Sequence, residues 1–129
     1  MDRNKVSELT GLLTRALYHR QALLEQPPRS AIRLFNGFYE GFPPLVVDLY
    51  ARTLVVFTHK LDAADSLALA QMVQQHLLAQ LDWIGCVLLK QRSSTHPDAK
   101  KGVVLYGAQP DTVVWENGVQ YALALRLNQ

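Results

Sequence analysis

Features of secreted and membrane proteins are scarce in this sequence. It has one cysteine, Cys86, in 129 residues, so an internal disulfide framework is excluded. Its apolar runs, such as Leu54 to Phe57, are far shorter than the roughly 20 residues that a membrane helix needs. The first five residues lack the apolar stretch of a secretory signal. We therefore expect a cytoplasmic protein that has no contact with a membrane.

The residue patterns of common catalytic and cofactor sites are also missing. The sequence has no Gly-x-Ser-x-Gly elbow, no phosphate-binding glycine loop and no Gly-x-Gly-x-x-Gly motif. The histidines have neither zincin spacing nor a cysteine pair nearby, which argues against a metal site at His19, His59, His76 or His96. Cys86 begins an apolar run, so we expect a small buried residue rather than a nucleophile. The sequence thus predicts no catalytic residue, no cofactor-binding residue and no metal ligand in this chain.

The chain does have enough apolar residues to build one compact core. Its composition is 49% hydrophobic, and a chain of this length can bury about two thirds of its unfolded surface. The net charge of +2 and the isoelectric point of about 8.8 tilt only slightly toward polyanions. We therefore expect a single folded unit whose partners cannot be inferred from net charge alone.

The distribution of charge is more informative than its sum. Between residues 90 and 101, Asp98 is the one acidic residue, and the cationic side chains are Lys90, Arg92, Lys100 and Lys101, with His96 beside them. Several cations on one flexible loop can neutralise phosphates and release counterions. We therefore predict that these four lysines and arginines contact RNA, the alternative being a solvated loop without such a role.

Apolar periodicity predicts two helices. Steps of three, four or seven residues predict a first helix from Val6 to Leu24, which ends before Pro27 and Pro28. Strict four-residue spacing predicts a second, amphipathic helix, which Asp62 or Asp65 could cap, through Leu69, Val73, Leu77 and Leu81. His76 falls on its polar side, where solvent exposure or a local hydrogen bond would accommodate it.

The remaining apolar runs read as short strands separated by turn residues. They are Ala31–Phe35, Leu45–Tyr50, Thr53–His59, Gly85–Lys90, Val103–Tyr106, Thr112–Glu116 and Val119–Leu125. We therefore predict an α+β fold, in which an N-terminal helix and one central amphipathic helix pack on a mostly antiparallel sheet.

Two of the predicted turns differ in their chemistry. Asn117-Gly118 is a strong hairpin signal, and its register places Val114 opposite Tyr121 and Trp115 opposite Gln120. Ala51-Arg52 is a poor two-residue turn, because a type I′ turn requires positive φ at both residues. We expect a longer loop or local strain there.

Some polar and aromatic residues leave two interpretations open. Asp48 alternates onto the strand face of Val46 and Tyr50, where pairing with a cation is favoured over a catalytic role. A loop rich in glycine and proline carries aromatic residues that either stack on unpaired bases or pack beneath the loop: Phe35, Phe38, Tyr39 and Phe42.

The segment from Ile32 to Tyr50, IRLFNGFYEGFPPLVVDLY, resembles the family of large-subunit ribosomal-RNA cytosine-5 methyltransferases. Lys90-Gln91-Arg92-Ser93 and Trp115-Glu116-Asn117-Gly118-Val119 are similar to later strands of the same subdomain. The resemblance spans about Ala31 to Leu125, and the matched positions are Arg33, Gly41, Pro43, Asp48, Arg92, Glu116, Asn117 and Gly118. The sequence departs from the family pattern at Pro44 and Leu49. It also has one helix in the place of the RNA-binding PUA domain that often precedes this subdomain in the family.

This resemblance implies a division of the chain and a role for it. Residues 1–28 would form an N-terminal helix, and residues 29–129 a β-β-α-β-β subdomain that precedes a Rossmann-like methyltransferase domain, which these residues do not include. The parent protein would be a bacterial enzyme that uses S-adenosylmethionine (SAM), and this chain would be its non-catalytic, RNA-positioning part. The expected partner is RNA.

Two other classes of function remain open from the sequence. The chain could instead be a protein-interaction or dimerisation module, for example one that forms a homodimer. Such a module would use an exposed apolar sheet face and would have no RNA contact. A free-standing small enzyme is the third interpretation, and it has little support from the residues themselves.

Overall fold

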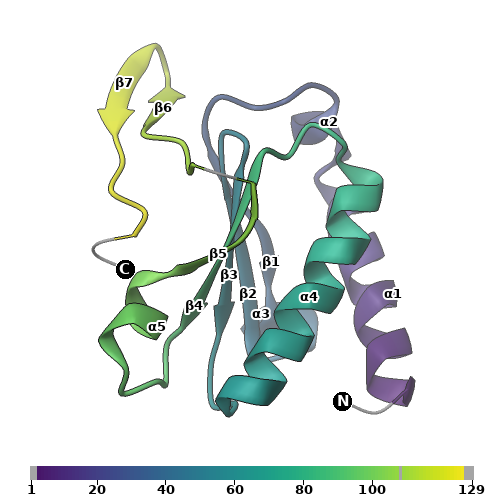
Figure 1. Cartoon of the computed structure of the whole chain (residues 1–129). Coiled ribbons are helices and arrows are strands. Elements are labelled where there is room, and N and C mark those ends of the chain that lie inside the picture. Colours follow the sequence, from purple (N-terminus) through teal and green to yellow (C-terminus); the bar gives the residue numbers. More distant parts are fainter. Residues whose placement is uncertain (1–2, 108, 127–129) are drawn as a thin grey trace.

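The computed structural model describes residues 3–107 and 109–126, which form a five-stranded mixed sheet with the two long helices on one side (Figure 1). The strands of this sheet are β1 (Ala31–Asn36), β2 (Leu45–Tyr50), β3 (Thr53–Thr58), β4 (Cys86–Gln91) and β5 (Val103–Gly107). A separate two-stranded sheet contains β6 (Val113–Glu116) and β7 (Val119–Ala122). The two long helices are α1 (Arg3–His19) and α4 (Ala63–Gln80), and the short ones are α2 (Gln21–Leu24), α3 (Gly37–Glu40) and α5 (Pro97–Lys101).

The strands of the large sheet lie in the order of the sequence. β1 pairs with β2, β2 with β3 and β4 with β5 in antiparallel fashion, and the pair β3 and β4 is parallel. A parallel pair needs a crossover, and α4 provides it. The predicted α+β class with a mostly antiparallel sheet is confirmed.

The main core lies between one face of the sheet and the two long helices. From α1 it takes Leu9, Leu13 and Ala16, and from α4 it takes Leu69, Ala70, Val73 and Leu77. Side chains from β1 to β4 meet them from the sheet, so α1, α4 and the sheet share one core. We call this side of the sheet the helix face.

The opposite side of the sheet, which we call the open face, has a smaller core. Val55, Phe57, Cys86 and Leu88 form it, and Leu125 from the chain beyond β7 covers them. Leu123 also packs against this cluster. In Figure 1 the β6–β7 hairpin and the segment after it lie on this side, opposite α1 and α4.

The turn chemistry expected from the sequence is present in both hairpins. Asn117 and Gly118 have φ of 52° and 78°, and Val114 faces Tyr121 as predicted. The Ala51-Arg52 connection is tight, and Ala51 has φ of 55°. Because an L-residue in this region costs roughly 1–2 kcal/mol, the strain expected at Ala51 is real.

Three local expectations from the sequence are wrong. The first helix does not run unbroken to Leu24, because Arg20 leaves helical geometry with φ of −110° and ψ of 11°. The segment predicted as a basic loop contains the short helix α5. A further helical turn, α3, occupies the segment after β1 that was predicted as turns alone.

No helix within the described ranges is both long and apolar enough to cross a membrane.

Candidate functional site

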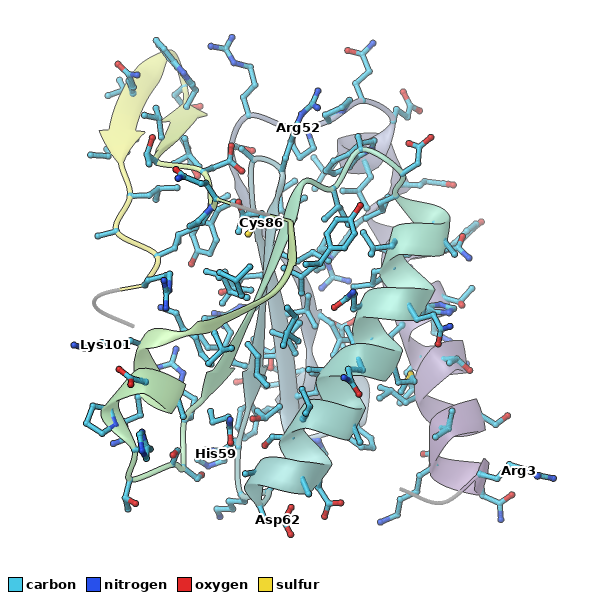
Figure 2. The ribbon with its side chains drawn as sticks, in the orientation of Figure 1. Arg3, Arg52, His59, Asp62, Cys86 and Lys101 are labelled. Carbon is cyan, nitrogen blue, oxygen red and sulfur yellow. The ribbon has the colours of Figure 1, made fainter. Side chains whose placement is uncertain are left out.

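The open face is only half covered by the end of the chain. Leu123 and Leu125 lie over the cluster around Cys86 and Leu88. Toward the other end of the sheet, where Figure 2 places His59, a cavity of about 450 Å³ opens to solvent. Its lining comes from β1, the following loop, β2, β3 and the end of β4: Arg33, Asn36, Phe38, Pro43, Pro44, Val46, Phe57, His59 and Arg92. We call this cavity the open-face pocket.

Arg33 is held at the pocket by Asp48 on the neighbouring strand. Arg33 and Asp48 are register partners, the Arg33 Nε donates to Asp48 Oδ1 over 2.7 Å, and Nη2 donates to Oδ2 over 3.1 Å. The hydrogen bond with Asp48 raises the pKa of Arg33. The expected pairing of Asp48 with a cation is therefore present, and the fork geometry of this bond fixes the guanidinium.

Tyr50 extends this polar row along β2. Its hydroxyl donates to Asp48 Oδ2 over 3.5 Å. Burial raises the pKa of Tyr50, and the negative charge of Asp48 adds to the effect. Tyr50 therefore stays neutral, and the charged side chains of this row are Arg33 and Asp48.

The loop that carries Phe38 is fixed by backbone geometry. A Cβ on Gly37 would overlap the carbonyl oxygens of Phe42 and Leu45, so glycine is required there. The Asn36 side chain accepts a hydrogen bond from the Phe38 N–H over 3.2 Å. Gly41, with φ of 103°, closes the turn in the left-handed region. The two glycines and the asparagine therefore fix the conformation of this loop.

A partly buried ion pair ties the same loop to the break between α1 and α2. Arg20 Nη2 donates to Glu40 Oε1 over 2.7 Å, and the Asn36 N–H donates to the same oxygen over 3.0 Å. Burial alone would raise the pKa of Glu40, but the hydrogen bonds from Arg20 and Asn36 outweigh it and lower that pKa. Arg20, where the first helix is interrupted, thus holds the loop in place through its ion pair with Glu40.

Arg92 and His59 form the far wall of the pocket. The Arg92 guanidinium lies over the Phe57 ring, 4.4 Å from its centroid, and is exposed on its outer side. His59 Nδ1 lies 3.4 Å from Ser93 Oγ, and that oxygen accepts the Lys60 N–H over 2.8 Å. The Phe38 and His59 rings are 6.3 Å apart. Flat groups and cations therefore share this wall.

Lys90 does not lie where the sequence analysis placed it. Its side chain is fully buried on the open face, and its ammonium has no hydrogen-bond partner within the described residues. Burial lowers the pKa of Lys90 to about 8, and the nearby charge of Arg92 adds to this. A buried ammonium does not reach a phosphate at the surface, so we withdraw Lys90 from the RNA-contact residues.

The other three predicted contact residues are at the surface. Arg92 is exposed and lines the pocket, and Lys100 and Lys101 are exposed in the last turn of α5. Lys100 and Lys101 are not among the residues that line the pocket. Figure 2 shows Lys101 at the outer edge of the molecule on the same side of the sheet. The contact of Arg92, Lys100 and Lys101 with RNA stays a prediction.

The remaining matched positions of the sequence motif have structural roles. Glu116 Oε1 accepts the Ala31 N–H over 3.2 Å and so connects the small hairpin to the start of β1. Asn117 and Gly118 make the hairpin turn. Pro43 is exposed and lines the pocket. Arg33, Pro43 and Arg92 are therefore the matched residues that this pocket brings together.

The four aromatic residues near the loop divide between the two interpretations. Phe35 is buried in the helix-face core and Phe42 packs against it. Phe38 and Tyr39 are 60% and 88% exposed, so packing does not explain them. Of these two, only Phe38 lines the pocket.

Sequence reasoning missed three of the pocket residues, namely Asn36, Phe57 and His59. Phe57 and Arg92 meet because β3 and β4 run parallel, a pairing that no local pattern indicates. His59 had been considered only as a metal ligand. Strand alternation carries a usable signal, because it places Val46, Phe57 and Arg92 on one side of the sheet once the pairing is known.

The fold is that of a small α+β domain, and the same fold occurs as part of two longer chains of known structure. A solved structure assigned as a SAM-dependent methyltransferase from Streptococcus mutans superposes with a TM-score of 0.67 at 16% identity, over 90% of this chain and 29% of its own. SMU.776, assigned as a methyltransferase and solved in complex with SAH, gives a TM-score of 0.69 at 17% identity, with the same coverage. No family model and no curated protein matches the chain.

These similarities confirm at the level of fold the resemblance that the sequence motif indicated. The chain spans less than a third of the length of the two methyltransferase structures. Similarity at 16% and 17% identity shows a shared fold. It leaves the chemistry to be argued from the pocket itself.

Proposed function

We propose that this chain is a non-catalytic, substrate-positioning domain of a cytoplasmic SAM-dependent methyltransferase that modifies ribosomal RNA. The observation that carries the proposal is the open-face pocket, which combines two arginines with exposed aromatic surface in a fold that recurs within methyltransferases. Phosphate binding and base stacking need these two kinds of side chain.

The open-face pocket does not suit SAM itself. The sulfonium of SAM is a cation, and its ribose hydroxyls are held by an acidic side chain in dinucleotide-type sites. The described residues that line the pocket include two arginines and no aspartate or glutamate. The carboxylates of Asp48 and Glu40, which adjoin pocket residues, are already bound to Arg33 and to Arg20. We therefore assign SAM binding and methyl transfer to the part of the enzyme outside this chain.

The charge around the open-face pocket favours a polyanion instead. Arg92 is exposed, and Lys100 and Lys101 extend the positive surface to α5. Of the two pocket arginines, Arg33 has a carboxylate partner and Arg92 has none within the described residues. Each such cation that neutralises a phosphate releases condensed counterions, which gives RNA affinity its dependence on salt.

The test is RNA binding and methyl transfer by the full-length protein across a salt series. We expect the logarithm of the affinity for unpaired RNA to fall linearly with the logarithm of salt, by about 0.7 per phosphate contacted. We also expect transfer of a labelled methyl group from SAM to ribosomal RNA. Absence of both RNA binding and RNA methylation would contradict the proposal.

A second candidate function is a protein-interaction module, for which a homodimer is one form, and the β6–β7 hairpin favours it. Trp115, Val119 and Tyr121 are 37%, 50% and 51% exposed there, and two-stranded sheets are marginal without a covering layer. Sedimentation over a concentration range distinguishes the candidates. A dimer without RNA affinity would favour this module.

A further inference from the structure

We propose that the open-face pocket holds one unpaired nucleotide, its base against Phe38 and its phosphate on Arg92. This inference rests on the proposed function and names the site and the form of RNA that it takes. The cavity of about 450 Å³ falls within the range of roughly 300–1,000 Å³ that small-ligand sites occupy. One nucleotide therefore fits, and a duplex does not.

The flat part of the ligand is recognised by the exposed ring of Phe38. Phe38 is 60% exposed although the loop that carries it is fixed by Gly37, Asn36 and Glu40. The exposed ring therefore stands at the pocket as an apolar surface that a ligand can cover. Unpaired bases stack on aromatic rings of this kind.

The anionic part of the ligand is recognised by charge that the protein leaves uncompensated. Arg92 has no carboxylate within ion-pair distance in the described part of the chain, and the buried Lys90 has no hydrogen-bond partner there. Arg92 lines the pocket just after β4, and Lys90, two residues earlier, is the register partner of the pocket residue Phe57. The two positive charges together raise the electrostatic potential at this end of the strand. A phosphate at Arg92 would balance this excess.

Specific contacts to the base edge are available from fixed polar groups. The Arg33 fork is oriented by Asp48 and remains 53% exposed at its side chain. When the Ser93 hydroxyl donates to His59 Nδ1, the imidazole proton lies on Nε2 and can be donated to the ligand. Neither group needs to reorganise before binding, which reduces the entropic cost of recognition.

The test measures binding of the chain to a labelled oligouridylate, to its duplex with oligoadenylate and to free uridine monophosphate. Phe38→Ala should weaken oligouridylate binding about 5- to 150-fold, the loss expected for one stacked base. Tyr39→Ala is the matched control, because Tyr39 is its exposed neighbour and does not line the pocket. That control should leave the affinity unchanged.

The outcomes separate this inference from the proposed function. Salt-dependent RNA binding that is equal in Phe38→Ala and Tyr39→Ala would overturn the pocket assignment and leave the proposed function standing. Duplex binding as tight as single-strand binding would do the same. Saturation by the free monophosphate at affinities above those for oligouridylate would assign the pocket to a free nucleotide and overturn the RNA source. If the full-length protein neither binds nor methylates RNA, whether single-stranded or duplex, both proposals are wrong.

Discussion

The two faces of the sheet follow different physical rules. The helix face is closed by α1 and α4 over a mainly aliphatic layer. Its buried polar side chains Thr58 and Ser66 are hydrogen-bonded to each other over 2.8 Å, and Thr14 of α1 meets His76 of α4 at 3.1 Å. The open face places an arginine, an aspartate and a lysine on the same strands and leaves one end uncovered. Burial of polar groups costs free energy unless they are paired. The contrast indicates that the helix face stabilises the fold and the open face carries a function.

The largest expected effect lies on the helix face. Leu69→Ala should lower the free energy of unfolding by about 2–5 kcal/mol, because Leu69 is fully buried and its removal leaves a cavity. Leu67→Ala, on the same helix and 41% exposed, is the matched control and should change it by less than about 1 kcal/mol. Urea unfolding of both variants measures the difference. Equal losses would show that the helix-face core is not where the stability resides.

The next effect lies on the open face and has the opposite sign. Lys90→Met should raise the free energy of unfolding at pH 7 by about 3 kcal/mol, because the fold lowers the pKa of Lys90 from 10.5 to about 8. The folded state therefore binds fewer protons than the unfolded state between about pH 8 and 10.5, and the wild type gains stability as the pH rises through this window.

The pH series supplies the check on the Lys90 variant. At pH 9.5 the advantage of Lys90→Met should fall to about 1.5 kcal/mol, since much of the penalty in the wild type has been relieved. Lys100→Met, at an exposed site on α5, should show neither the gain nor its pH dependence. A Lys90→Met variant less stable than the wild type at pH 7 would mean that the ammonium has a partner.

A smaller effect is expected where the open-face pocket meets solvent. Arg92→Gln should lower the free energy of unfolding by no more than about 1 kcal/mol, the value of an exposed contact between a cation and an aromatic ring. RNA affinity at low salt should fall in the same variant. Thermal unfolding beside a binding titration separates the two effects, and a loss of several kcal/mol would assign Arg92 to the fold rather than to recognition.

The sequence predicted the elements whose signal is local. The Asn117-Gly118 register agrees residue by residue, and the second strand is found at its predicted bounds, Leu45–Tyr50. The structure differs from the prediction where contacts between segments distant in the sequence determine the local conformation. Arg20 interrupts the first helix to reach Glu40, and α5 is too short at five residues to show a helical period.

The candidate site was harder to predict than the fold for the same reason. The open-face pocket gathers residues from β1, α3, β2, β3 and β4, and only the parallel pairing of β3 with β4 brings Phe57 beside Arg92. Lys90 was placed on the surface by composition, but strand alternation turns it inward. The motif positions Arg33, Pro43 and Arg92 indicated the right region because they meet at this pocket.

The salt dependence of RNA binding by the full-length protein tests the central claim most directly. Charge reversal of Arg92, Lys100 and Lys101 should reduce the logarithmic salt slope by about two units. It should lower the free energy of unfolding by no more than about 1 kcal/mol, the loss expected where Arg92 leaves Phe57, since all three side chains are exposed. The matched control reverses Arg3, Arg15 and Arg52, which are exposed on α1 and at the opposite end of the sheet (Figure 2) and change the net charge equally. The account predicts a slope near that of the wild type for this control. Equal slopes for the two triple variants would contradict an RNA interface on the open face.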